Sequence, residues 1–109
     1  MMDRESKQMF KLMADVLAAA GQPVRLAVLD FLKDGEKCVC DIADYVEAER
    51  SNVSRHLSVM LNAGLVTQRK DGLKMMYALR TPCILNITKC CAGVLKERAR
   101  ESQAVLGAL

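Results

Sequence analysis

Five cysteines are the residues in this sequence best suited to chemistry, and they fall into two groups. Cys38 and Cys40 flank a single valine, whereas Cys83, Cys90 and Cys91 occur in the last third of the chain. Thiolates bind soft ions and also form disulfides. The odd number cannot be closed by disulfides within the chain alone, and a cytosolic protein keeps its thiols reduced. The sequence therefore points to thiolate ligation or to redox sensing.

The spacing of the cysteines separates better ligands from weaker ones. Cys38 and Cys40 would point to opposite sides of a strand, or lie about 200° apart on a helix, so one ion binds both only where the backbone is irregular. Cys90 and Cys91 lie about 100° apart on a helix, whereas Cys83 is about 10 Å from Cys90 along the axis. These three fall on an apolar stripe and can equally be small packed side chains. Cys38 and Cys40 are the preferred ligands.

Two amphipathic helices are expected before the first cysteine pair. Apolar residues recur at helical spacing over residues 6–20, and Gly21-Gln22-Pro23 interrupts that run. Pro23 suits the first turn of a second helix, because its missing N–H is not needed there, and Asp34-Gly35 ends this helix. Residues 36–39 are too few to classify.

A helix-turn-helix is expected over about residues 40–63. Residues 40–48 carry apolar side chains on one side, as a short helix would, and Glu49-Arg50 then makes a turn. Ser51 is a good N-cap for the next helix, which Ala63-Gly64 closes. That second helix turns its apolar residues inward and leaves a small, polar and basic face outside.

A β-hairpin wing and a last helix are expected after it. The runs 65–70 and 73–80 resemble strands, and Asp71-Gly72 between them favours a two-residue turn. Thr81 is expected to cap a final helix that begins at Pro82 and continues to about residue 105. The pattern predicts one α+β domain over residues 1–109, mainly α, with about five helices and a two-stranded wing.

The charge distribution marks a candidate DNA-binding face. The whole chain carries only +3, but residues 30–49 contain seven acids against two lysines, and residues 50–80 contain six bases against one acid. Arg55 is the best candidate for contact with a guanine or the DNA backbone. His56 is, in order of preference, a packed residue, a phosphate contact or a metal ligand. The predicted DNA-binding residues are Ser51, Asn52, Ser54, Arg55, His56, Ser58, Arg69, Lys70 and Lys74.

Several classes of protein are not expected. No run approaches the roughly 18 consecutive apolar residues of a membrane span, and the polar start differs from a signal peptide, so we expect a cytoplasmic protein with no membrane partner. The chain has no Cys-x-x-Cys motif, phosphate loop or carboxylate pair, and its only histidine lies on the predicted DNA-facing helix. An enzyme is therefore not expected.

The element order and two sequence strings resemble the ArsR/SmtB family of bacterial and archaeal metalloregulatory repressors, over about residues 8–95. Lys37-Cys38-Val39-Cys40-Asp41-Ile42-Ala43 resembles the family's metal box, and Val53-Ser54-Arg55-His56-Leu57 resembles the start of its recognition helix. The resemblance implies a winged helix-turn-helix homodimer, built largely from helices at about 6–20 and 82–105. It also implies that the ligand-free dimer binds a palindromic operator in double-stranded DNA and leaves it when ligand binds.

The resemblance further implies an inducer, arsenite (As(III)) or another soft ion such as Cd, Pb or Sb, and no organic cofactor. The family's arsenite sensors carry a third cysteine where this chain has Ala43, and residues 1–37 contain no cysteine. A third thiolate must then come from Cys83, Cys90 or Cys91, in the same or the partner subunit. Some arsenite sensors place adjacent cysteines on the last helix, so two separate sites or one composite site remain open. The family's Asp, His and Glu pattern for zinc and nickel is absent.

The expected function is a transcriptional repressor that leaves its operator when thiolates of Cys38, Cys40 and a third cysteine bind a thiophilic ion. The first alternative is a redox or persulfide sensor on the same fold, in which two of these cysteines form a disulfide or polysulfide. A soft-metal carrier that never binds DNA is another alternative, and its binding to duplex DNA would lack a steep salt dependence.

Overall fold

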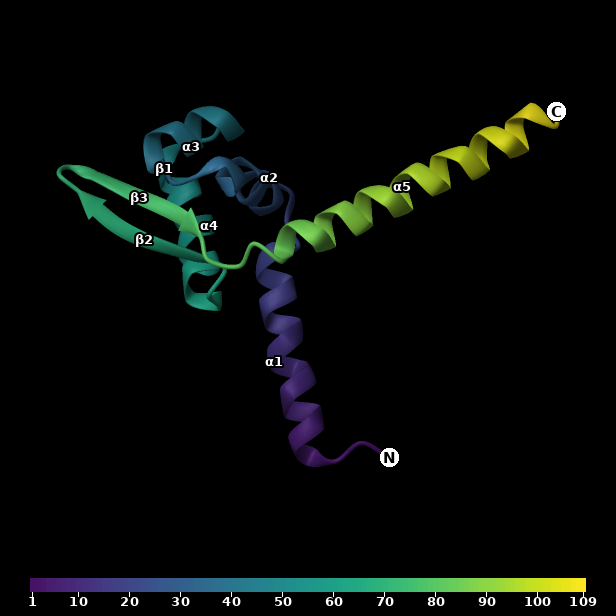
Figure 1. Cartoon of the computed structure of the whole chain (residues 1–109), viewed down its shortest axis with the longest axis horizontal. Helices are drawn as coiled ribbons and strands as arrows, with labels where there is room; N and C mark the ends of the chain where they lie inside the picture. The colour runs from purple at the N-terminus through teal and green to yellow at the C-terminus, as the bar shows by residue number, and fades with distance from the viewer.

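The computed structural model describes residues 1–109, which form five α-helices and three strands (Figure 1). Helices α1 and α5 project from the remaining elements in two different directions. The elements are α1 (Arg4–Ala20), α2 (Pro23–Phe31), a 3-10 turn η1 (Leu32–Asp34), β1 (Lys37–Cys38), α3 (Val39–Val46), α4 (Arg50–Ala63), β2 (Val66–Asp71), β3 (Lys74–Leu79) and α5 (Ile84–Gly107).

Local sequence explains most of the helix ends. Asp3 caps α1 by accepting a hydrogen bond from the Ser6 N–H over 2.7 Å, and that bond lowers the pKa of the Asp3 carboxyl. Gln22 caps α2, with Pro23 in the first turn as predicted. Gly64 ends α4 at φ +85°, a left-handed conformation that favours glycine, so the predicted end at Ala63-Gly64 is confirmed.

Two predicted helix caps and the predicted turn of the wing are wrong. Helix α4 begins at Arg50 after Glu49, so Ser51 lies inside the helix and is not its N-cap. Helix α5 begins at Ile84 rather than Pro82; the Thr81 hydroxyl donates to the Leu65 carbonyl, and no side chain caps this helix. The wing turns at Gly72-Leu73 instead of Asp71-Gly72, since Asp71 still pairs with Lys74 and Gly72 takes the positive φ of +63°.

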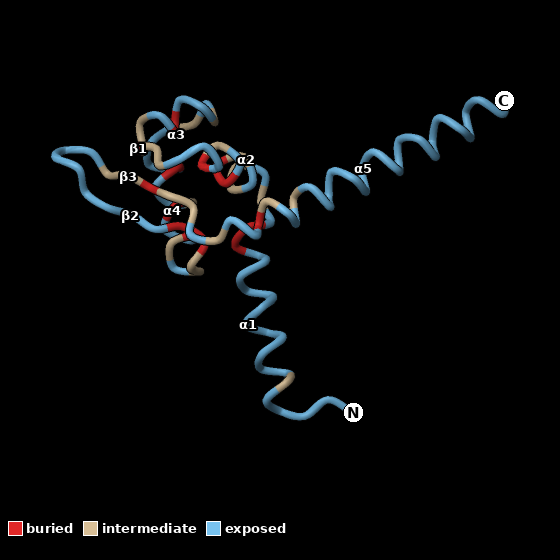
Figure 2. Tube along the Cα trace, viewed as in Figure 1, coloured by how far each residue is buried: buried red, intermediate tan, exposed pale blue.

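The core lies where α2, α3 and α4 meet the sheet (Figure 2). Apolar residues at helical spacing turn inward from each helix, as the periodicity predicts. Helix α3 is also held against α2 by stacking of Phe31 on Tyr45, whose ring centroids are 4.2 Å apart. The largest fully buried side chains are Leu29, Ile42, Leu57, Met60, Leu65, Val28, Val53 and Val66.

The wing belongs to a three-stranded antiparallel sheet in the order β1-β3-β2, so the prediction of a two-stranded wing missed one strand. Strand β1 pairs Lys37 with Tyr77 and Cys38 with Met76 of β3. Two residues carry no alternation that sequence could reveal, and long-range pairing alone makes them a strand. The wing is thereby attached to the segment that leads into α3.

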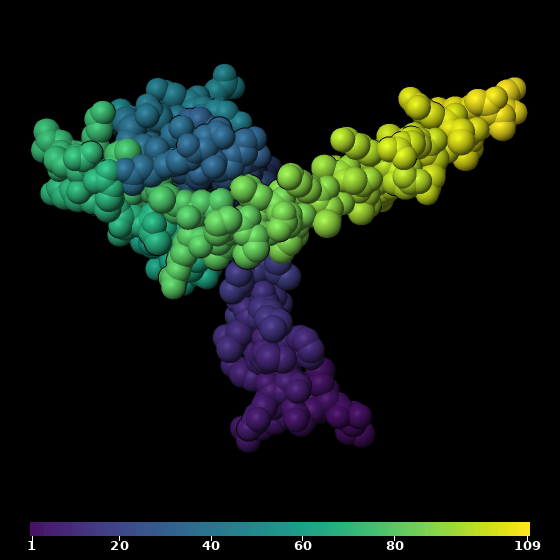
Figure 3. Space-filling model, in the orientation of Figure 1, coloured from purple at the N-terminus to yellow at the C-terminus, as the bar shows by residue number.

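Helices α1 and α5 project away from the other elements and are exposed along most of their length (Figures 2 and 3), and their exposed residues include many large apolar side chains. On α1 only Ala19 and Ala20 are buried, and on α5 only Ile84. No single helix is long and apolar enough to cross a membrane; α1 with the α2–η1 segment meets that requirement only as a pair, bent by 79°.

Candidate nucleic-acid interface and thiol site

Helix α4 separates an inner and an outer face. Val53, Leu57 and Met60 are fully buried and fix the helix against the core. The predicted DNA-reading residues Ser51, Asn52, Ser54, Arg55 and Ser58 are all exposed. Hydroxyl, amide and guanidinium groups at these positions can reach base edges and phosphates. The outer face therefore has the composition of a recognition helix.

His56 lies differently from its neighbours on α4. Its Nδ1 accepts a hydrogen bond from Nε of Arg25 over 3.1 Å, and Arg25 also donates from Nη1 to the Ala19 carbonyl over 3.4 Å. The histidine is half-buried and directed toward α2. This geometry matches the first of the three interpretations of His56, a packed helix residue.

The wing presents fewer free cations than its sequence indicates. Arg69 binds both carboxylate oxygens of Glu36, with an Nε–Oε2 distance of 2.9 Å, and also approaches Asp71. This pairing lowers the pKa of the Glu36 carboxyl and raises that of the Arg69 guanidinium. Lys70 and Lys74 are exposed and form no ion pair within the chain. Two of the three predicted wing residues thus remain available to phosphates.

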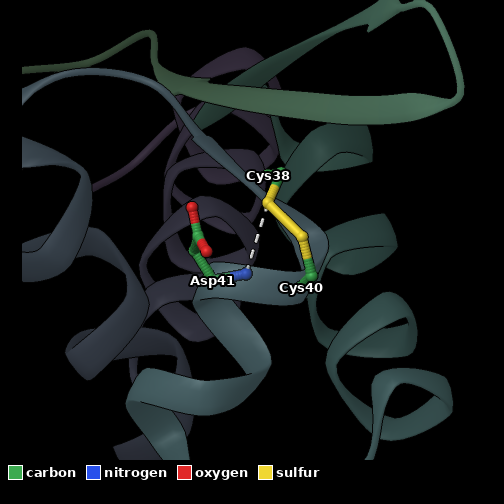
Figure 4. A group of neighbouring side chains, drawn as sticks. All are labelled: Cys38, Cys40 and Asp41. Carbon is green, nitrogen blue, oxygen red and sulfur yellow. Dashed lines mark hydrogen bonds between the residues drawn. A yellow bond between two sulfur atoms is a disulfide. The ribbon is translucent and has the colours of Figure 1, made fainter.

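Cys38 and Cys40 meet at the junction of β1 and α3 (Figure 4). Cys38 is extended, with φ −80° and ψ 159°, while Cys40 already lies in the first turn of α3. This change of backbone conformation directs both side chains to the same place, and the two sulfur atoms are joined as a disulfide, with Cα atoms 5.4 Å apart. The junction is therefore irregular, in the way that shared ligation requires.

Exposure and hydrogen bonding distinguish the two sulfur atoms. Cys38 is 3% exposed and caps α3, its Sγ accepting from the Asp41 N–H over 3.3 Å (Figure 4). Cys40 is half-buried and reaches the surface. A hydrogen bond from the backbone at a helix N-terminus favours negative charge on sulfur. The pair thus combines one buried and one accessible sulfur.

Asp41 is a third potential ligand that the sequence analysis did not single out. One carboxylate oxygen and the sulfur atoms of Cys38 and Cys40 all lie within 4.8 Å of one another. The Cys38-x-x-Asp41 spacing could have predicted this ligand. When the cysteine is a helix N-cap, the residue three positions later lies close to it. Arg50, exposed in the first turn of α4, lines a groove together with Cys38 and Cys40 and was not predicted either.

Cys83, Cys90 and Cys91 are exposed free thiols on or just before α5. None of them joins Cys38 and Cys40 in a group close enough to hold one ion. Cys91 instead lines a groove of about 680 Å³ between α1, α2 and α5, together with apolar residues that include Leu17, Leu26 and Leu95. Within one chain the structure thus brings two of the five predicted thiols together.

Comparison with known sequences identifies similar proteins. Residues 22–68 match the sequence model of a protein family, described as bacterial regulatory proteins of the arsR family. The arsenical resistance operon repressor of Staphylococcus xylosus is 36% identical over 70 residues, which are 64% of this chain and 67% of that protein. An uncharacterised HTH-type transcriptional regulator of Mycobacterium tuberculosis, Rv0081, is 31% identical over 103 residues, covering 94% of this chain and 90% of its own.

The fold is also found in a solved structure, the homodimeric winged helix-turn-helix DNA-binding domain of Mb0332 from Mycobacterium bovis, described as a possible ArsR-family transcriptional regulator. It matches with a TM-score of 0.77 at 23% identity, covering 92% of this chain and 93% of that one. Such relatives are DNA-binding transcriptional regulators rather than enzymes. With the exposed face of α4 and the wing beside it, these matches establish that the chain belongs to the ArsR family of bacterial regulatory proteins.

Proposed function

We propose that the protein is a transcriptional repressor that binds operator DNA as a homodimer and releases it when the Cys38–Cys40 pair captures arsenite or another thiophilic ion. One observation carries this proposal: the two sulfur atoms meet at the N-terminus of α3, between the wing and the recognition helix. A reaction at this junction acts on both DNA-reading elements together.

DNA binding by this chain is supported by the outer face of α4 and the wing. Arg55 would contact a guanine or a phosphate from the major groove, while Ser51, Asn52, Ser54 and Ser58 would contact base edges or the backbone. Lys70 and Lys74 of the wing would bind phosphates beside the major groove. We keep Arg69 and His56 in the proposed interface only as residues that fix the wing and the helix, because each is bonded within the chain.

Dimerisation is supported by the uncovered faces of α1 and α5. Phe10, Met13 and Leu17 are about half exposed on α1, as are Ile87 and Val94 on α5. A domain of about 100 residues buries only roughly two-thirds of its unfolded surface, and large exposed apolar patches mark interaction sites. A second copy that covers both helices would also close the groove lined by Cys91.

Release of DNA would follow from the connections of Cys38. Its backbone pairs with Met76 in β3, and its Sγ caps α3, which packs against α4. An ion held by both sulfurs would fix the turn between β1 and α3 in one conformation and bias the relative position of wing and recognition helix. A coupling free energy of about 1 to 3 kcal/mol, typical of allosteric proteins, would weaken operator binding roughly five- to 150-fold.

The donor set fits a soft ion in part. Two sulfurs suit As(III), Cd, Pb or Sb, and the Asp41 carboxylate lies within the same 4.8 Å group. A third thiolate would suit arsenite better than a carboxylate does. Because Cys83, Cys90 and Cys91 do not approach the pair within the chain, we propose that any third thiolate comes from α5 of a second copy.

A redox response is the second candidate, and a specific observation favours it. Cys38 and Cys40 are joined as a disulfide without any third group. Oxidation would then produce the same constraint at the β1–α3 junction that an ion produces. This form needs neither Asp41 nor a thiolate from α5.

The test is titration of arsenite, cadmium, lead and hydrogen peroxide into a protein–operator complex, followed by fluorescence anisotropy. Cys38→Ser and Cys40→Ser should abolish release, whereas Cys90→Ser and Cys91→Ser test whether a thiolate from α5 of a second copy completes the site. If both variants of the pair still release DNA like the wild type, the proposed site is wrong. If peroxide releases DNA and no ion does, the redox candidate replaces the ion-binding one.

A further inference from the structure

A second groove, of about 270 Å³, lies where α3, α4 and the wing meet. Its wall contains both members of the thiol pair. Val39 of α3 lies between them in the chain, and the remaining residues come from the DNA-reading elements: Arg50 and Ser54 from α4, and Leu73, Lys74 and Met75 from the wing. The groove thus joins the reactive sulfurs to the two elements that are proposed to hold DNA.

The groove wall carries two cations, Arg50 and Lys74, while the Asp41 carboxylate lies within 4.8 Å of the two sulfurs. Arg50 and Lys74 form no ion pair, and no aspartate or glutamate lines the groove. Ser54 adds a hydroxyl donor on the same wall. Unpaired cations that converge on a concave surface attract anions and raise their local concentration. The two cations of the wall therefore favour a small ligand with negative charge.

The sulfurs in this wall differ in access, which sets the order of a reaction. Cys40 is half-buried and open to the groove, whereas Cys38 is 3% exposed. An incoming molecule reaches Cys40 first, and Cys38 lies close enough to react with Cys40 afterwards, since their sulfurs bond to each other. Such an arrangement, with an accessible attacking thiol and a buried resolving thiol, suits thiol–disulfide exchange.

We infer that the groove binds a small anionic disulfide, the oxidised form of a low-molecular-weight thiol that carries carboxylates, and uses it to oxidise the Cys38–Cys40 pair. This inference rests on the redox form of the proposed function and names its substrate class. Arg50 and Lys74 hold the carboxylates, and the disulfide of the ligand lies against Cys40.

The reaction proceeds by two exchanges. The Cys40 thiolate attacks one sulfur of the ligand, the ligand's S–S bond breaks, and half of the ligand leaves as a thiolate. The Cys38 thiolate then attacks Sγ of Cys40 and expels the second half. The two protein thiols lose two electrons and two protons, and the ligand gains both as two molecules of thiol. The product is the Cys38–Cys40 disulfide of the structure.

The test compares three disulfide probes that differ in charge on one reduced protein. The protein is the full chain with Cys83, Cys90 and Cys91 replaced by Ser, so that only the pair reacts. The probes are dithiodiglycolate, which is anionic, hydroxyethyl disulfide, which is neutral, and cystamine, which is cationic. The rate of thiol loss should fall in that order, by about fivefold or more from the anionic to the neutral probe after correction for their intrinsic rates with a free thiol.

Variants of the two cations connect this preference to the groove. Arg50→Gln and Lys74→Gln should each reduce the rate with dithiodiglycolate several-fold and leave the neutral probe unchanged. Lys70→Gln, which removes a neighbouring lysine outside the groove, should leave all three rates unchanged. Equal corrected rates for the three probes, or an equal loss in Lys70→Gln, would overturn the inference.

Operator release is measured separately, so the two proposals fail in different ways. A charge preference that requires Arg50 and Lys74 supports the groove even where oxidised protein still binds DNA, and that result would reject the redox form of the proposed function alone. Release of DNA on oxidation without any charge preference rejects the groove alone.

Discussion

Arg25 donates a hydrogen bond from Nε to Nδ1 of His56 over 3.1 Å, and so connects the first turn of α2 to the recognition helix. The same guanidinium donates from Nη1 to the carbonyl of Ala19 in the last turn of α1. One side chain therefore joins the helix that is proposed to dimerise, the helix that supports the core and the helix that is proposed to read DNA. Nothing in the sequence pattern relates residues 25 and 56, which lie on different elements.

Replacement of Arg25 by Gln should weaken both the fold and operator binding. The variant loses two half-buried hydrogen bonds, and we expect a loss of about 1 to 2 kcal/mol in the free energy of unfolding. Urea denaturation of Arg25→Gln, His56→Ala and the double variant measures the coupling, which should be about 1 kcal/mol. Arg55→Gln is the control, because Arg55 is exposed and should change stability little. Additive losses in the double variant would show that the bond contributes nothing.

Arg55 and Lys70 should differ in how they affect DNA binding. If Arg55 contacts a base edge, Arg55→Ala costs about 1 to 3 kcal/mol on the operator and reduces discrimination against unrelated sequences. If Lys70 contacts a phosphate, Lys70→Ala weakens binding to all duplexes and lowers the salt slope by about one. Binding titrations at several salt concentrations measure both. Lys33, which is paired with Asp30 away from these elements, provides a control substitution.

The helical part of the fold could be predicted because its signals are local. The inward spacing of Val53, Leu57 and Met60 and the closing Gly64 depend only on nearby residues, and the structure matches them. Strand β1 could not be predicted, since Lys37 and Cys38 become a strand only through pairing with β3, about 40 residues later in the chain.

The candidate site was predicted in its residue types but not in its geometry. The Cys38-Val39-Cys40 string indicated soft-ligand chemistry, yet neither a strand nor a helix brings these sulfurs together. They meet because the chain changes from extended to helical between them, and that change depends on the sheet pairing of Cys38. Arg69 was interpreted from its charge as a DNA contact, and its binding to Glu36 is another long-range relationship that composition does not reveal.

The wing should loosen in acid through Glu36. Its pKa is held below the ordinary value of 4.5 mainly by the hydrogen bond from Arg69, so the pair contributes stability above that value and loses it as pH falls through the lowered pKa. Glu36→Gln should therefore increase amide exchange in β2 and β3 at neutral pH. Wild type should approach the variant only in acid, as measured by NMR. Identical wing exchange in both proteins at neutral pH would contradict this role for Glu36.

A charge on the uncovered faces of α1 or α5 should separate the proposed dimer without unfolding the monomer. Leu17 is 52% exposed and Ile87 is 46% exposed, so glutamate at either position costs little in one chain, but in a dimer it would bury an unpaired carboxylate. We expect Leu17→Glu and Ile87→Glu to raise the dimer dissociation constant by about 100-fold or more, as measured by sedimentation equilibrium.

Leu73→Glu is the matched control for this experiment. Leu73 lies at the tip of the wing, fully exposed, and the same substitution there should leave the dimer intact. Circular dichroism should show unchanged helix content in all three variants, because none of these side chains belongs to the buried core. Operator binding should be lost with the dimer, since two recognition helices are needed to contact both halves of a palindromic site. If Leu17→Glu and Ile87→Glu each sediment like the wild type, α1 and α5 are excluded as the dimer interface.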